Sequence, residues 1–230
     1  MGKDSQHYKD KARSQKIKLR ELISQLPKAG SDYIYSKEIT TQPSTLVSYS
    51  YDLLTFFRYL KANNPSLASM EIKNMDYNVL SQLNTDDIIE YQHYLELNVE
   101  GEIHENGKKA IARKMAPLRG MFKYLHENKI LADDPCILAP LPRLKKDKNI
   151  IRMSNYEVQA ILEAIESGLN LATNRQKKYC EKTKYRDLAI LTLMLNTGIR
   201  VSECNGLDLS DVDLRVNSLT IVRKGGGQDL

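Results

Sequence analysis

Apolar side chains recur at helical spacing in several segments of this chain. The segment 43–63 is a clear case, since Pro43 suits a first helical turn and the residues from Asn63 to Pro65 end the pattern. Another helix is predicted after the capping sequence Asn84-Thr85-Asp86-Asp87. The apolar face of 43–63 consists of Leu46, Tyr49, Leu53, Phe56, Phe57 and Leu60. Faces of this kind predict a helical core.

The first 26 residues also show helical spacing, and Pro27 stops the helix. In about the first dozen of them, the many lysines and arginines are typical of a solvated face on a frayed terminal helix. The next region, 28–42, contains Gly30, Ser31 and Asp32 and has no periodicity. We therefore expect a loop there, with at most a short turn.

The polar face of the predicted helix 43–63 carries hydroxyl groups and one cation. Hydroxyl donors can lie against a phosphate backbone, although an ordinary polar surface is the commoner reason for such a face. The face consists of Ser48, Tyr51, Thr55, Arg58 and Tyr59. We select Ser48, Tyr51 and Thr55 as candidate DNA contacts.

The segment 106–128 separates apolar from basic residues on a helical wheel. Its apolar side consists of Ile111, Met115, Leu118, Met121, Phe122 and Leu125, and its basic side of Lys108, Lys109, Arg113, Arg119 and Lys123. No acidic residue occurs between Lys108 and Leu125. A solvated face is the alternative, but such faces usually mix both signs of charge. We therefore predict a helix that contacts DNA phosphates, kinked or split at Pro117.

Prolines stiffen the region that follows, and cations such as Lys145 and Lys146 come directly after them. A domain boundary is predicted here, with a helical domain at 1–137, a basic linker at 138–153 and a second domain at 154–230. The linker is either a solvated tether or an extended segment that crosses a DNA backbone, with Lys145 and Lys146 as candidate contacts.

The second domain begins with a capping box at Ser154, which predicts a helix. Further on, the run 188–195 is apolar apart from one threonine, so we expect a helix buried on every side. Gly198 supplies a left-handed cap, and Arg200 follows where this helix ends. A guanidinium suits phosphate, and Glu203, three residues later, is placed to orient it. The alternative is an ordinary surface ion pair.

The segment 218–222 contains the β-branched residues Thr220, Ile221 and Val222, which favour a strand. Lys224 and three glycines follow this strand. A triple glycine after a strand is usually a mobile hairpin. It is not a nucleotide-binding P-loop, because the lysine precedes the glycines.

The amino-acid composition excludes several classes of function for this chain. The 34 lysines and arginines exceed the 29 acidic residues by only 5, so any affinity for a polyanion must come from clusters. The three cysteines form no CxxC pair, which is typical of free thiols in a reducing cytoplasm. The four histidines lack ligand spacing, so no metal site is expected. No run is long and apolar enough for a signal peptide or a membrane span.

The C-terminal region contains the string Thr197-Gly198-Ile199-Arg200-Val201-Ser202-Glu203, then Gly206-Leu207, Asp211-Val212-Asp213 and the Lys224 hairpin. Together these resemble the first catalytic box and the β-hairpin of the tyrosine recombinases, the integrase and Xer type of site-specific DNA recombinase. The stretch from Met115 to Pro135 likewise resembles the last helix of their core-binding domain.

This resemblance implies a mainly α fold with two domains. The first would be a helical, SAM-like core-binding domain that clamps DNA, and the second the N-terminal part of a mixed α/β catalytic domain with a β-hairpin. Relatives break and rejoin strands through a 3′-phosphotyrosyl intermediate, without a cofactor. Arg200 would stabilise the transition state, Glu203 would support it, and Lys224 would protonate the leaving 5′ oxygen. The implied partner is double-stranded DNA with a specific recombination site, on which the full-length protein would assemble as a tetramer.

The family pattern continues with a His-x-x-Arg box and a nucleophilic tyrosine, and none of the 13 tyrosines here lies in that context. We therefore expect the 230 residues to be a truncated recombinase that is inactive alone. A DNA-binding module or decoy integrase without chemistry is the alternative. A small-molecule phosphotransferase is disfavoured, because the sequence has no nucleotide cradle.

Overall fold

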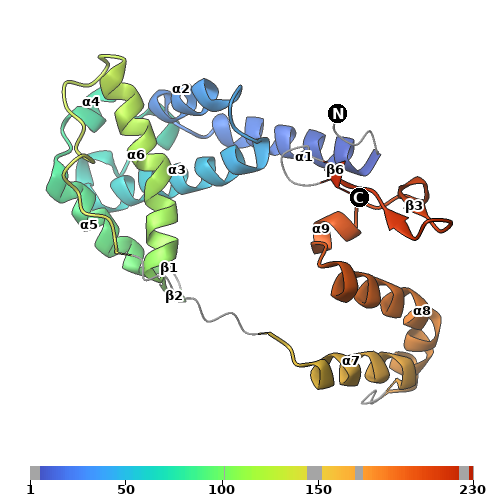
Figure 1. Cartoon of the computed structure of the whole chain (residues 1–230). Helices are drawn as coiled ribbons and strands as arrows, with labels where there is room; N and C mark the ends of the chain where they lie inside the picture. The colour runs from blue at the N-terminus through green and yellow to red at the C-terminus, as the bar shows by residue number, and fades with distance from the viewer. Residues whose placement is uncertain (1–5, 101, 144–151, 169–172, 223–227, 230) are drawn as a thin grey trace. The chain divides into compact units, whose positions relative to one another are not determined.

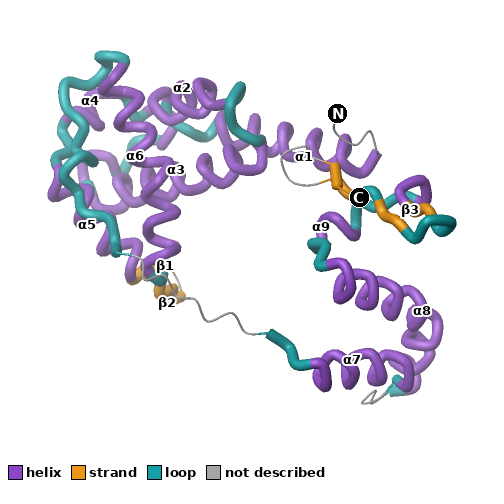
Figure 2. The backbone as a smooth tube through the Cα atoms, viewed as in Figure 1, coloured by secondary structure: helices purple, strands orange, loops and turns teal. Residues whose placement is uncertain are grey.

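The computed structural model describes residues 6–100, 102–143, 152–168, 173–222 and 228–229. The chain divides into two compact units. The N-terminal unit comprises Lys11–Lys146, and the C-terminal unit comprises Asp147–Leu230 with Met1–Asp10. Helices dominate both units, and the strands form small two-stranded antiparallel sheets (Figure 2). The predicted mainly helical fold is therefore confirmed.

The N-terminal unit is a set of helices packed around one apolar core (Figure 1). Its elements are α1 (Gln6–Ile23) from Lys11 onward, α2 (Lys28–Lys37), α3 (Pro43–Asn63), η1 (Pro65–Leu67), η2 (Ile72–Asn74), α4 (Tyr77–Ser81), α5 (Thr85–Glu96), β1 (Leu97–Glu100), β2 (Glu102–Glu105) and α6 (Lys108–Glu127). Helix α6 packs against α2, α3 and α5.

Local sequence explains where these helices begin. Pro43 occupies the first turn of α3, as predicted. At α5 the Asn84 side chain accepts hydrogen bonds from the backbone N–H groups of Asp86 and Asp87, while the Asp87 carboxylate accepts one from the backbone of Asn84. This capping box satisfies donors that the first helical turn would otherwise leave without partners.

Aromatic rings form the centre of the core. The ring of Phe56 on α3 makes edge contacts with Tyr91 on α5, at a centroid distance of 5.0 Å, and with Phe122 on α6, at 6.1 Å. All three side chains are buried. Burial of a side chain of this size stabilises a fold by about 1.5–3 kcal/mol, so this cluster contributes substantially to the packing of α3, α5 and α6.

The loop predicted for 28–42 is wrong, because Lys28–Lys37 forms helix α2. Four of its residues, Ala29, Gly30, Tyr33 and Ile34, are buried against the core. Tertiary packing therefore overrides the weak helix propensity of Gly30 and Ser31.

Two long helices dominate the C-terminal unit. Its elements are α7 (Asn155–Ser167), α8 (Asn174–Thr197), α9 (Val201–Cys204), η3 (Leu209–Asp211), β3 (Val212–Asp213), β4 (Ser218–Leu219), β5 (Ile221–Val222) and β6 (Gln228–Asp229). Helix α7 packs on α8, and β3 pairs with β4 while β5 pairs with β6. The predicted strand at 218–222 is thus divided at Thr220 between two hairpins.

The capping box at Ser154 is present, and its Oγ accepts a hydrogen bond from the Glu157 backbone. Helix α8, however, is not buried on every side as predicted. None of its residues is buried, and Ile190 and Leu195 are 39% and 37% exposed. Among the described residues, only α7 and α9 make extensive contacts with it, so part of its apolar surface has no covering layer.

Candidate DNA-binding and catalytic site

Arg200 lies in the sharp turn between α8 and α9. Gly198 ends α8 with a left-handed backbone (φ 66°), and its N–H donates to the Met194 carbonyl at 2.9 Å. Glycine adopts this conformation without steric strain. Ile199 then turns inward and is buried, and Arg200 forms the N-cap of α9. The turn therefore directs consecutive side chains inward and outward.

Glu203 fixes the orientation of Arg200. The Glu203 carboxylate accepts hydrogen bonds from the Arg200 backbone N–H at 2.8 Å and from the Arg200 Nη1 at 2.6 Å. The Glu203 side chain is only 5% exposed, whereas that of Arg200 is 63% exposed. A buried acid therefore holds one edge of the guanidinium, and much of the remaining side chain faces solvent, where an anion can bind.

Lys224, the second candidate catalytic residue, lies outside the described residues. So do the candidate linker contacts Lys145 and Lys146. The structure does give the two strands that flank the Lys224 turn: Ile221 pairs with Asp229, and Val222 with Gln228. The chemical roles of Arg200 and Lys224 stay predictions.

The hydroxyl face of α3 is present in part. Ser48 and Tyr51 are exposed, and Thr55 is partly exposed. Ser48 and Thr55 each donate a hydrogen bond to a backbone carbonyl one turn earlier on α3. Tyr59 does not belong to this surface, because it is buried and packs on the rings of Tyr91 and Tyr94.

The structure brings the five predicted cations together on one helix, α6, which continues through Pro117 without splitting. Lys108 and Lys109 are exposed in its first turn. Lys123 lies 3.7 Å from Glu127, just beyond the segment without acidic residues, and Arg119 donates a hydrogen bond to the Ala139 carbonyl at 2.9 Å. Two of the five cations therefore have partners within the protein.

Arg113 has an acidic partner on another helix. Its guanidinium pairs with Asp52, a buried residue of α3 that we did not select from the sequence. The sequence contained a signal of this burial, because Asp52 lies four residues before Phe56 and therefore on an inward-facing side of the helix. A charged residue at such a position predicts a buried partner of opposite charge.

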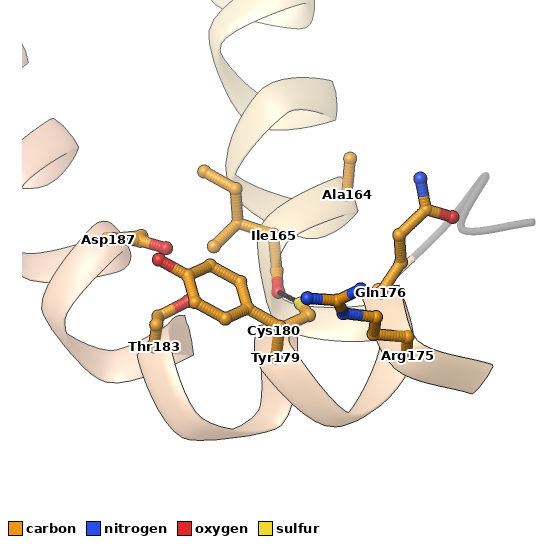
Figure 3. A pocket seen from close by; sticks show the side chains of 9 residues that line it. Ala164, Ile165, Arg175, Gln176, Tyr179, Cys180, Thr183 and Asp187 are labelled. Carbon is orange, nitrogen blue, oxygen red and sulfur yellow. Dashed lines mark hydrogen bonds between the residues drawn. The ribbon is translucent and has the colours of Figure 1, made fainter. Parts of the chain in front are cut away.

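A pocket of about 560 Å³ lies between the end of α7 and the start of α8 (Figure 3). Ile165, Tyr179, Cys180 and Asp187 are among the residues that line it, and none of the predicted site residues is. Asp187 precedes the end of α8 by roughly 15 Å of helix. The pocket is therefore separate from the surface around Arg200.

Other kinds of site find little support in the structure. The described residues contain no cluster of three or more His, Cys, Asp or Glu side chains arranged to hold a metal ion. Within the same residues, no helix has the length and apolarity needed to cross a membrane. The three cysteines are free, and burial raises the pKa of the Cys136 thiol to about 12, which makes it unreactive.

Comparison with known proteins supports the same family as the sequence. Residues 151–229 match the model of the phage integrase family. The chain is 29% identical to the tyrosine recombinase XerC of Caldanaerobacter subterraneus over 81% of its own length and 48% of that protein. It is 30% identical to XerD of Vibrio vulnificus, over 81% and 51%, and 28% identical to XerS of Streptococcus thermophilus, over 92% and 65%.

The chain thus spans about half the length of these XerC and XerD relatives and somewhat more of XerS. The alignments extend over both units, and the phage integrase match contains the Arg200 turn with its Glu203 anchor. The chain is thus similar to tyrosine recombinases over both units, and its residues 151–229 match the phage integrase family.

Proposed function

We propose that this chain binds duplex DNA and, within the complete protein, takes part in site-specific strand cleavage and rejoining. The observation that carries the proposal is the exposed guanidinium of Arg200, which a buried glutamate holds inside the segment that matches the phage integrase family. A cation fixed in this way stabilises charge on a phosphoryl group without having to reorganise during the reaction.

The proposed reaction is a pair of transesterifications. A tyrosine oxygen attacks the scissile phosphate, a 3′-phosphotyrosyl bond forms, and the 5′ oxygen leaves with a proton. Attack by a 5′-hydroxyl of another strand then reverses the step. Arg200 would neutralise charge on the phosphate, and Lys224 would supply the proton. Because one phosphate ester replaces another, the reaction needs no external source of energy.

The two units would divide this work. The N-terminal unit would act as the helical clamp, with phosphate contacts from Lys108 and Lys109 on α6 and from the exposed hydroxyls of α3. Residues 138–153 would link it to the start of a mixed α/β catalytic domain at 154–230. Four such proteins assembled on the recombination site would place two cleaved strands together for exchange.

A nucleophile has not been identified in these 230 residues. None of their tyrosines follows a His-x-x-Arg box, and several, such as Tyr59 and Tyr91, are buried in the N-terminal core. We expect the chain alone to bind duplex DNA without forming a covalent bond to it.

Two measurements test this function. Fluorescence anisotropy with a labelled duplex should show binding whose logarithmic affinity falls linearly as the logarithm of salt concentration rises. A nicked duplex that traps cleavage products should give no protein–DNA adduct on a denaturing gel. Affinity that does not respond to salt would contradict the proposed clamp, and an adduct would show that one of the 13 tyrosines is the nucleophile.

A further inference from the structure

Asp52 is a charged residue in an apolar environment. It lies on α3 beside Leu53 and Leu54, and only 4% of its side chain is exposed. A carboxylate in such a place loses most of its hydration and needs partners of opposite charge. Burial raises the pKa of Asp52 above its ordinary value, and the charges of Arg113 and Lys114 act against that rise.

The main partner of Asp52 is Arg113 on α6. The Nη1 of Arg113 donates to Oδ2 at 2.8 Å, and its Nη2 donates to Oδ1 at 3.2 Å, so the pair is bidentate. The ammonium of Lys114 lies 3.8 Å from Oδ1. Two parallel hydrogen bonds fix both the position and the plane of a guanidinium, which a single contact does not.

Arg113 itself is not buried by this pairing. Its side chain is 56% exposed, against 22% for Lys114. A guanidinium has five N–H donors, and the two bonds to Asp52 leave three of them for other partners. Arg113 also lies one helical turn from exposed Lys109, on the face of α6 that we propose to contact phosphates.

We propose that Asp52 is a positioning residue for DNA binding, which holds the Arg113 guanidinium in place on α6 so that its outer edge binds a DNA phosphate. The inference rests on the proposed function, because it needs α6 to meet DNA. The benefit is entropic: an arginine that is already fixed loses less side-chain freedom on binding.

A pure charge effect makes the opposite prediction. The change Asp52→Asn removes a negative charge near the DNA surface, so electrostatics alone would tighten binding. If Asp52 positions Arg113, the same change weakens binding, because the arginine loses its fixed orientation.

The experiment is a double-mutant cycle in the 230-residue chain. Affinity for a fluorescein-labelled duplex is measured across a salt series for wild type, Asp52→Asn, Arg113→Ala and the double variant, at a temperature where circular dichroism shows each one folded. We expect Arg113→Ala to reduce the steepness of the salt dependence by about 0.9, the value for one phosphate contact. Asp52→Asn should weaken binding at every salt concentration, because the freed arginine loses more side-chain freedom on binding, and it should add nothing to Arg113→Ala.

The pair of Arg20 and Glu38 provides a matched control. It is also bidentate, with Nη1–Oε1 and Nη2–Oε2 distances of 2.5 and 3.1 Å, but it joins α1 to the end of α2 and involves none of the proposed DNA contacts. Glu38→Gln should leave both the affinity and its salt dependence unchanged. An equal effect of Glu38→Gln and Asp52→Asn would overturn the inference.

Other results would also overturn it. Tighter binding by Asp52→Asn would show a charge effect, and equal weakening with and without Arg113 would show a purely structural role. If Asp52→Asn does not fold, Arg113→Lys serves instead, since it keeps the charge but loses the fork. It should weaken binding while retaining the salt dependence of wild type, and wild-type affinity would contradict positioning. Salt-independent wild-type binding would count against the proposed function itself.

Discussion

The two units differ in how completely they bury their own side chains. In the N-terminal unit, α2, α3, α5 and α6 enclose a continuous core that includes Phe56, Phe57 and Phe122. In the C-terminal unit, α7 and α8 contain no buried residue, and the buried hydrophobic side chains among its described residues are Ile199 and Ile221. With buried Glu203, Ile199 lies next to Arg200. The best-packed part of this unit is therefore the turn that carries its candidate catalytic residue.

The comparison is tested most strongly by removing one large side chain from each unit. Phe56→Ala should lower the free energy of unfolding by about 3–5 kcal/mol, because it leaves a cavity among aromatic rings. Ile190→Ala should cost less than about 1 kcal/mol, since this side chain is already partly exposed. Urea unfolding followed by circular dichroism measures both. Phe56→Leu, which retains more volume, is the control, and equal costs at the two sites would contradict the difference between the units.

Arg200 and Lys224 test whether chemistry belongs to the C-terminal unit. If the complete protein has the proposed activity, Arg200→Ala or Lys224→Ala should slow its cleavage by roughly 10²–10³, equivalent to about 2.7–4 kcal/mol, with nearly normal DNA binding. Rates of cleavage and affinities for the recombination site measure the two effects. Arg215→Ala is the control, because its guanidinium pairs with Asp213 on the surface of the same unit.

A substrate with a 5′-bridging sulfur separates the two roles. Its thiolate leaves without a proton, so it should restore cleavage by Lys224→Ala far more than by Arg200→Ala. Equal rescue of both variants, or of neither, would contradict the proposed division between proton donor and charge stabiliser.

Alkaline pH should act first on the N-terminal unit, which contains the buried phenols. Burial raises the pKa of Tyr33 to about 12. Since the ordinary value is 10.0, the folded unit retains this proton between pH 10 and 12 while the unfolded chain releases it. The stability contribution is complete below pH 10 and should fall by about 2–3 kcal/mol as pH rises to 12.

Unfolding free energies of wild type and Tyr33→Phe between pH 9 and about 12 measure this contribution. The variant should lose less stability over that range. Tyr35→Phe is the control, because Tyr35 is 48% exposed and should leave the alkaline decline as it is. Parallel curves for wild type and Tyr33→Phe would contradict the prediction.

The smallest effect should come from a single exposed cation. Lys109→Ala should reduce the slope of logarithmic affinity against logarithmic salt by about 0.9 and leave the fold unchanged. Lys73→Ala is the control, since Lys73 is equally a surface lysine of this unit but pairs with Glu71. If both variants change the slope equally, α6 has no special part in binding.

Features set by neighbouring residues were predictable from the sequence. The start of α3 at Pro43, the capping boxes at Asn84 and Ser154, and the left-handed Gly198 each depend on a few adjacent positions. The apolar face of α6 was also predictable, because helical periodicity alone defines it.

Features that depend on residues far apart in the sequence were not predictable in this way. Helix α2 forms because its buried face meets the core, and its glycine and serines conceal this in the sequence. Asp52 and Arg113 are separated by 61 positions, so a charge count along α6 cannot reveal the pair. The burial of α8 depends on which segments cover it, and an apolar run does not specify them.

The backbone conformation of Gly198 determines the direction of the Arg200 side chain, although Gly198 has no side chain of its own. A methyl group added at Gly198 would meet nothing within 4 Å, so its cost is limited to backbone strain of about 1–2 kcal/mol. The guanidinium of Arg200, however, lies far from this turn, so a small rotation of the backbone displaces it considerably. A rotation of about 10° there moves a group roughly 10 Å away by nearly 2 Å, and a misplacement of about 1 Å can cost 10²-fold in rate. Gly198→Ala should therefore alter the cleavage rate of the complete protein far more than its melting temperature.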